Sequence, residues 1–200
     1  MAFCFPRLYG KENLPPLGET VMYVPNHTSF MDILVMSGVV PRPFKYLSKS
    51  EVKAIPVIGH AMQMAQHVFL KKDDVRSTLD CSDLCIQRLK DGNSMALFAE
   101  GTRSLDGRLK KFKKGAFQMA KAAGVRIVPV SIGNLHRWMP PSALLPLAPI
   151  RGVYVMIHPA IDTRDKSTKE IRKDVEDAVN SGLPSFQKRI PDLELVNGIQ

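Results

Sequence analysis

A histidine and an aspartate close together in the sequence could form a general-base pair. His27 and Asp32 bound the stretch His-Thr-Ser-Phe-Met-Asp, directly after the apolar run Val21–Pro25. Loops that follow strands often carry catalytic groups. A carboxylate on one imidazole nitrogen fixes the tautomer and leaves the other nitrogen to accept a proton. The spacing therefore allows catalysis by His27, although Ser29 and Asp32 alone also match a helix capping box in which His27 has no part.

A turn that contains glycine and arginine is the second feature with chemical potential. Residues Phe98–Ser104 read Phe-Ala-Glu-Gly-Thr-Arg-Ser. Such a turn can present backbone N–H groups and the Arg103 guanidinium to an oxyanion, and a guanidinium can grip phosphate through two hydrogen bonds. Nearby lysines add point charge: Lys110, Lys111, Lys113 and Lys114. The alternative is an ordinary strand exit with a surface ion pair between Glu100 and Arg103.

A charged run, Lys71–Arg76, follows the short apolar run Val68–Leu70. Taken by itself, this pattern favours the solvated start of a helix, because Asp73 and Asp74 suit the positive end of a helix dipole.

Apolar runs alternate with helix-length segments along the chain. Strands are expected at Val21–Pro25, Phe44–Leu47, Ser94–Phe98, Arg126–Ile132 and Gly152–His158. Helices are expected at Phe30–Gly38, Asp74–Asp91 and Gly115–Ala123, and after the capping-box pairs Ser48 with Glu51 and Ser167 with Glu170. The apolar face of the Asp74–Asp91 helix would hold Val75, Leu79, Ile86 and Leu89. This alternation predicts a single α/β domain with a central, mostly parallel or mixed sheet flanked by helices.

The composition limits the classes of partner. A chain of 200 residues suits one domain, and its net charge of +9 fits nucleic acid, an anionic bilayer, a phosphorylated substrate or simply a solvated basic surface. Aromatic residues are not interleaved with the basic ones, which argues against nucleic acid. The five histidines are scattered, which argues against a metal-dependent phosphohydrolase. The three cysteines suggest no disulfide framework, and Cys81 and Cys85 are interpreted as packing residues.

No segment predicts a membrane-spanning helix or an evident signal peptide. The longest uncharged stretch, Ala54–Leu70, contains Pro56 and Gly59, which disfavour a spanning helix. The segment Met139–Ile150 holds four prolines among leucines and can form neither a regular helix nor a central strand. We therefore interpret it as a candidate membrane contact or acyl-chain wall.

Taken together, the motifs resemble the glycerolipid acyltransferase family in their order and spacing. The His-x4-Asp block of that family is similar to His27–Asp32, and its second block to the stretch from Lys45 through Pro56 to Lys72. Its third block resembles Phe98–Ser104 with the downstream Gly107, Phe112, Lys113, Gly115 and Ala116, and its fourth resembles Ile127–Val130. The resemblance covers roughly residues 8–165.

Finer features point to one branch of the family. The Glu-Gly-Thr-Arg form of the third block resembles enzymes that act on 1-acylglycerol 3-phosphate. The segments Val68–Cys81, Trp138–Pro141 and Ile157–Pro159 resemble the plastid and cyanobacterial branch. Two residues depart from the pattern: Ala99 stands where proline is usual, and Lys72 where arginine is usual.

The resemblance implies transfer of a fatty acyl group from acyl-CoA or acyl carrier protein to the sn-2 hydroxyl of 1-acylglycerol 3-phosphate, which gives phosphatidic acid. His27 would be the general base and Asp32 its orienting carboxylate. Lys72, Thr102 and Arg103 would bind the acceptor phosphate, while Glu100 would orient Arg103 or the turn at Gly101. No metal and no cofactor besides the acyl co-substrate would be needed.

The expected partners are lysophosphatidate, the acyl carrier and an anionic membrane surface, with peripheral association at a plastid or bacterial-type inner membrane. The chain is divided into a lead-in (1–20), an acyltransferase domain (21–165) and a C-terminal helix and tail (166–200). Two alternatives stay open: a basic membrane-binding module without catalysis, and an acyltransferase for another lysophospholipid.

Overall fold

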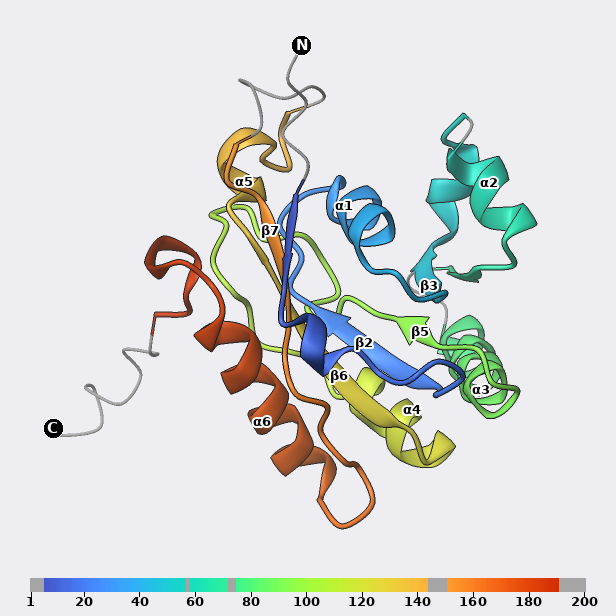
Figure 1. Ribbon diagram of the computed structural model, residues 1–200. Helices are drawn as coiled ribbons and strands as arrows, with labels where there is room; N and C mark the ends of the chain where they lie inside the picture. The colour runs from blue at the N-terminus through green and yellow to red at the C-terminus, as the bar shows by residue number, and fades with distance from the viewer. Residues whose placement is uncertain (1–5, 57, 72–74, 144–150, 191–200) are drawn as a thin grey trace, which may run out of the picture.

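One mixed sheet runs through the protein in the computed structural model, which describes residues 6–56, 58–71, 75–143 and 151–190 (Figure 1). Within these residues the sheet has seven strands in the order β1-β7-β6-β2-β5-β3-β4. Their bounds are β1 Arg7–Tyr9, β2 Val21–Pro25, β3 Lys45–Lys49, β4 Val68–Leu70, β5 Met95–Ala96, β6 Arg126–Gly133 and β7 Tyr154–Ile157. Neighbouring strands are parallel except β6 and β7, which are antiparallel. The predicted α/β class is confirmed.

Helices cover both faces of the sheet. One face carries α3 (Val75–Lys90), α4 (Gly115–Ala123) and α6 (Thr168–Ser181). The other carries α1 (Asp32–Val39) and α5 (Leu135–Trp138). Because successive strand residues point to opposite faces, Met22 and Val24 of β2 pack under the first group, and Val21 and Tyr23 under the second. The remaining helices are α2 (Ile58–Met64) and the 3₁₀ helices η1 (Lys11–Asn13), η2 (Ser50–Ala54) and η3 (Ser185–Gln187).

Several elements have the bounds that the sequence predicts. The strand Val21–Pro25 and the helix Gly115–Ala123 match residue for residue. The second capping box also forms, because the Ser167 hydroxyl accepts from the Glu170 N–H at 3.3 Å and the Glu170 carboxylate accepts from the Ser167 N–H at 2.8 Å. This cap fixes where α6 begins.

The capping box predicted at Ser48 and Glu51 is wrong. Ser48 continues β3 and pairs with Phe69 of β4, so it cannot start a helix. A short 3₁₀ helix follows instead, without a side-chain cap, and ends at Ala54. Ile55 is extended, as expected of a residue that precedes a proline. The α-helix α2 therefore begins only after Pro56.

The buried face of α3 differs from the prediction. Leu79 is 61% exposed, whereas Cys81, Cys85 and Leu89 are buried one turn apart. A thiol packs like a small apolar side chain, and a stripe through the two cysteines competes with the stripe through the leucines. The interpretation of both cysteines as packing residues is confirmed.

The predicted lead-in and C-terminal helix both pack onto the sheet of the acyltransferase domain. Strand β1 pairs with β7, and α6 buries Ile171, Val175 and Val179 in the core under β6. The boundaries at residues 20 and 165 stay a prediction. In the predicted membrane-contact segment, Met139 is buried in the core, so this residue is not a membrane contact; residues 144–150 lie outside the described part.

Candidate active site

Two adjacent parallel strands bring the two motifs to one edge of the sheet. Strands β2 and β5 pair directly, with Tyr23 opposite Ala96. After β2 the chain continues to β3, which lies on the β5 side of β2 in the sheet. After β5 it continues to β6, which lies on the opposite side, next to β2. Ligands of open α/β sheets bind at such switch points, beyond the carboxyl ends of the strands. The residues that follow β2 and β5 include both predicted motifs.

His27 and Asp32 form a hydrogen-bonded pair at this edge. The His27 Nδ1 and Asp32 Oδ2 atoms are 2.8 Å apart. The same carboxylate oxygen accepts hydrogen bonds from the backbone N–H groups of Thr28 (2.7 Å) and Ser29 (2.8 Å), and Asp32 is fully buried. With Nδ1–H donating to the carboxylate, Nε2 is the nitrogen that can accept a proton.

The rival interpretation of Ser29 and Asp32 as a capping box is wrong. Helix α1 begins at Asp32, two residues later than predicted, and its N-cap Met31 makes no side-chain cap. The Asp32 carboxylate instead turns back toward residues 27–29, which holds the preceding turn outside the helix.

Two neighbours that the sequence analysis did not select as site residues fix the position of His27. The buried Asn26 side chain donates to the Ile132 carbonyl at 3.1 Å and accepts from the Ile132 N–H at 2.7 Å, which ties the end of β2 to β6. Phe98 stacks on the imidazole, with ring centroids 4.0 Å apart. Their signal in the sequence is position alone, since each stands next to a motif residue.

Glu100 connects the two motifs. Its carboxylate accepts from the backbone N–H of His27 at 2.7 Å and from that of Lys110 at 3.2 Å. The Ser104 N–H also donates to the His27 carbonyl at 2.8 Å. Glu100 therefore orients the turn, and no ion pair between Glu100 and Arg103 is present among the described residues. Burial raises the pKa of Glu100 to about 8, although the two backbone hydrogen bonds oppose the shift.

The turn itself is exposed and surrounded by positive charge. Lys110 Nζ donates to the Thr102 hydroxyl at 3.1 Å and to the Arg103 carbonyl at 3.3 Å. Gly101 has φ +75°, and a Cβ added there would lie 2.9 Å from the end of the Lys113 side chain. Lys110 and Lys113 are thus candidate anion-binding residues that the basic run signalled without distinguishing them from Lys111 and Lys114.

Lys72, predicted to contact phosphate, lies outside the described residues, so its place stays a prediction. Thr102 and Arg103, by contrast, are brought to the same sheet edge as His27. The described residues include no group of three or more His, Cys, Asp or Glu side chains that could hold a metal ion.

Comparison with known proteins decides the family. A family model described as Acyltransferase matches residues 6–133, a range that contains His27, Asp32 and the whole of the Glu100 turn. The chain belongs to the acyltransferase family.

The acyltransferases most informative for this chain carry related names. A 1-acyl-sn-glycerol-3-phosphate acyltransferase from Chlamydomonas reinhardtii is 39% identical over 177 residues, which cover 88% of this chain and 52% of the algal protein. A chloroplastic one from Arabidopsis thaliana is 46% identical over 66% of this chain and 36% of its own length. The chain thus spans about half, or less, of the length of these relatives.

A solved acyltransferase has the same fold. The 1-acyl-sn-glycerophosphate acyltransferase PlsC from Thermotoga maritima superposes with a TM-score of 0.76 at 31% identity, covering 90% of this chain and 71% of that chain. The predicted resemblance to the glycerolipid acyltransferases is confirmed. The chloroplastic relatives agree with the plastid side of the predicted branch.

Proposed function

We propose that this acyltransferase moves a fatty acyl group from a thioester carrier, acyl-CoA or acyl carrier protein, to the sn-2 hydroxyl of 1-acylglycerol 3-phosphate, which gives phosphatidic acid. The observation that carries the proposal is the His27–Asp32 pair at 2.8 Å beside a basic turn joined to it by Glu100. The names of the relatives and of the solved neighbour support the acceptor.

His27 acts on the acceptor hydroxyl. Its Nε2 removes the hydroxyl proton as the oxygen attacks the thioester carbonyl, so that a C–O bond forms and the C–S bond breaks. The proton passes from the imidazolium to the leaving sulfur. Asp32 holds the ring and stabilises the imidazolium, and such general-base assistance contributes about 10²–10⁴-fold.

The acceptor phosphate occupies the basic turn. This turn, residues 100–103, carries Thr102 and Arg103, and the side chains of Lys110 and Lys113 lie against it. Lys72 is proposed to add a further charge. Holding the phosphate there fixes the adjacent glycerol hydroxyl near the imidazole, so binding energy is converted into orientation.

The direct test is an acyl-transfer assay with the purified protein. We expect phosphatidic acid, detected by mass spectrometry, from 1-acylglycerol 3-phosphate with at least one of the two donors, and none with the His27→Ala variant. A panel of lysophospholipids with other headgroups tests the choice of acceptor. Faster transfer to another lysophospholipid would replace the proposed substrate. Vesicle binding without transfer to any acceptor would favour the non-catalytic membrane module.

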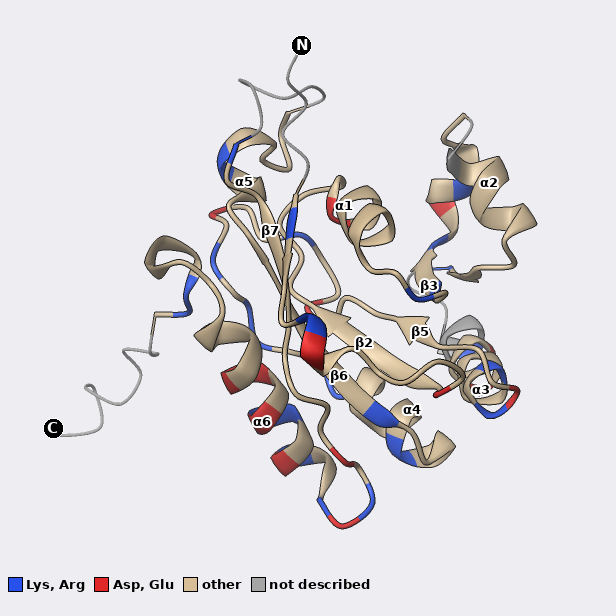
Figure 2. Cartoon of the chain, viewed as in Figure 1, with Lys and Arg blue, Asp and Glu red and all other residues tan. Residues whose placement is uncertain are grey.

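The same chemistry requires contact with the membrane that holds the acceptor. No helix among the described residues has the length and apolar character needed to cross a bilayer. We propose peripheral contact through the η2–α2 segment (residues 50–56 and 58–64), where Ile55 and Met64 are exposed, Met64 by 74%. Lys49, the last residue of β3, and Lys53, within η2, are exposed as well. Figure 2 shows Lys and Arg in blue in this part of the chain. The names of two relatives, which are chloroplastic, support a plastid membrane as the place of action.

The position of this segment favours contact at the active-site edge. It follows the carboxyl end of β3, the same end of the sheet that carries His27. Helix α6, in contrast, carries acidic and basic side chains together, so its charge gives it little attraction to an anionic surface (Figure 2). A bilayer touching η2–α2 would therefore present the acceptor headgroup toward the basic turn.

A further inference from the structure

The segment after α6 pairs with the loop that follows the Glu-Gly-Thr-Arg turn. The Leu109 N–H donates to the Gln187 carbonyl at 2.8 Å, and the Arg108 guanidinium donates to the Lys188 carbonyl at 3.1 Å. The residues that make these contacts on the C-terminal side lie beyond residues 6–133, the part that matches the family model. Gln187 and Lys188 thus touch a loop that follows the proposed active-site turn.

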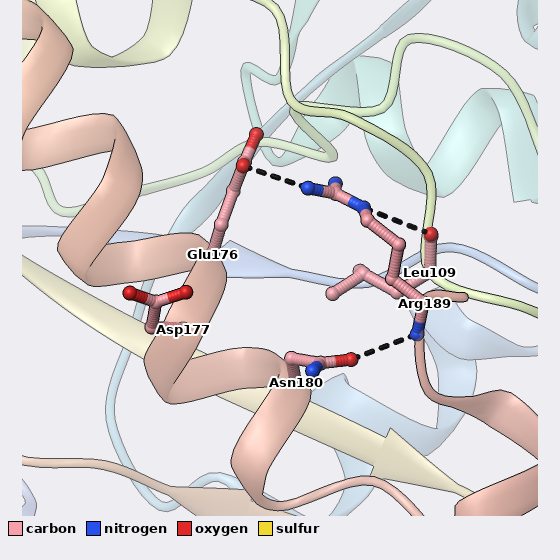
Figure 3. A pocket seen from close by; sticks show the side chains of 5 residues that line it. All are labelled: Leu109, Glu176, Asp177, Asn180 and Arg189. Atoms are coloured by element: carbon pink, nitrogen blue, oxygen red, sulfur yellow. Dashed lines mark hydrogen bonds and ion pairs between the residues drawn. The ribbon is translucent and has the colours of Figure 1, made fainter. Parts of the chain in front are cut away.

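A partly buried ion pair strengthens this contact. Arg189 Nη1 donates to the Glu176 carboxylate at 2.9 Å, and the other Glu176 oxygen accepts from the Phe112 N–H at 2.6 Å. Arg189 also donates to the Lys110 carbonyl at 2.5 Å and, more weakly, to the Leu109 carbonyl at 3.5 Å. Figure 3 shows the Arg189 side chain between Glu176 and Leu109. The pair therefore holds the backbone on both sides of Lys111.

Lys110 is the residue through which this pair reaches the active site. The Lys110 carbonyl accepts from Arg189, and the Lys110 N–H donates to Glu100. The Lys110 Nζ donates to the Thr102 hydroxyl and to the Arg103 carbonyl. A shift of the Lys110 peptide would displace the Nζ contacts and one of the two hydrogen bonds on Glu100. The contacts form a continuous chain from α6 to the turn.

We propose that Glu176 and Arg189 are positioning residues that hold Lys110 and, through it, set the turn that receives the acceptor phosphate. This inference rests on the proposed function. Both residues act through main-chain contacts at Leu109, Lys110 and Phe112. Their side chains border a cavity of about 140 Å³ with Leu109, Asp177 and Asn180 (Figure 3). A different side chain at position 189 would border this existing space, so it would not force neighbouring atoms together. We therefore expect Arg189→Met and Arg189→Lys to fold.

The test measures KM and kcat in variants of Arg189 and in a control variant that loses a different ion pair. Arg189→Met should raise the KM for 1-acylglycerol 3-phosphate by about threefold to tenfold, as expected of coupling through a contact network, with kcat and the donor KM nearly unchanged. Arg189→Lys should recover part of this, because an ammonium can pair with Glu176 but cannot reach both carbonyls. Lys173→Met is the matched control, since it removes an exposed ion pair with Asp177 on the same helix.

A second measurement does not depend on turnover. Hydrogen–deuterium exchange of residues 100–112 should be faster in Arg189→Met than in the wild type, and a short-chain 1-acylglycerol 3-phosphate should protect this segment less. Lys173→Met should match the wild type. Absence of transfer by the wild type would contradict the proposed function alone, because exchange still decides the positioning role. Unchanged exchange and protection, or equal loss of activity toward monoacylglycerol, would overturn the inference.

Discussion

The backbone N–H of His27 donates to the carboxylate of Glu100 at 2.7 Å. One buried side chain thus links the turn that carries the proposed base, His27, to the turn that carries Thr102 and Arg103. The connection is made to the main chain and leaves the imidazole free to contact Asp32. The distance between base and proposed phosphate site is therefore set by the protein before any substrate binds, which is how preorganised sites lower the cost of orientation.

The first prediction concerns the His27–Asp32 pair. His27→Ala should lower kcat by about 10²–10⁴-fold while the far-ultraviolet circular dichroism spectrum stays the same, because the ring, 16% exposed on its turn, supplies chemistry rather than core packing. Asp32→Asn should also lose at least about 100-fold, because a neutral amide cannot stabilise the imidazolium. Near-normal turnover in Asp32→Asn would show that the carboxylate only shapes the turn.

The phosphate site is tested by pairing acceptors with variants. Arg103→Ala should weaken use of 1-acylglycerol 3-phosphate by at least about tenfold, the cost of one charge-assisted contact. Monoacylglycerol, which lacks the phosphate, should be a poor acceptor that the substitution barely affects. Arg103→Lys should recover only part of the loss, since it lacks the planar fork. An equal loss with the two acceptors would assign Arg103 a structural role.

The contact between position 101 and Lys113 can be tested apart from the backbone strain that any side chain at positive φ causes. Gly101→Ala and Gly124→Ala each place a Cβ at positive φ, +75° and +70°, and should each cost about 1–2 kcal/mol in the free energy of unfolding. Only at Gly101 does the added Cβ meet a side chain, Lys113, whereas nothing lies within 4 Å at Gly124. We expect a raised acceptor KM in Gly101→Ala alone. The same KM in both variants would remove Lys113 from the site.

The raised pKa of Glu100 makes stability depend on pH. Between its usual value of 4.5 and about 8, the folded protein retains a proton that the unfolded chain has released. The free energy of unfolding should therefore fall as pH rises through this window. Asp32 reinforces the shift and Lys110 opposes it. Glu100→Gln should lack this slope in urea unfolding at pH 5, 6.5 and 8; parallel slopes for the two proteins would disprove it.

Membrane contact is tested by flotation with vesicles. Binding should be stronger to anionic than to neutral vesicles and should weaken as salt rises, at about 1 kcal/mol per basic side chain near the surface. Met64→Ser and Ile55→Ser should each reduce binding. Leu17→Ser is the control, because Leu17 is even more exposed than Met64 but lies before the amino end of β2. A loss in Leu17→Ser as large as in Met64→Ser would move the contact elsewhere.

Local patterns in the sequence were sufficient for much of the fold. Val21–Pro25 is an unbroken apolar run, which is typical of a strand buried on both faces, and Ser167 with Glu170 is a cap whose two hydrogen bonds are local. The pairing of His27 with Asp32 was predictable for the same reason, since five residues of turn are enough to bring them together. Such features depend on neighbours in the chain.

Tertiary structure alone decided which of several equivalent residues matter. The sequence offers two apolar stripes on α3 and four lysines after the turn, and nothing local distinguishes among them. The sheet selects Cys81 over Leu79 because it covers one face of the helix. Lys110 is selected because Glu100 and Thr102 of the preceding turn and Arg189, a distant residue in the chain, converge on it. The Arg189 contact arises only when distant segments pack together, so no spacing rule reveals it.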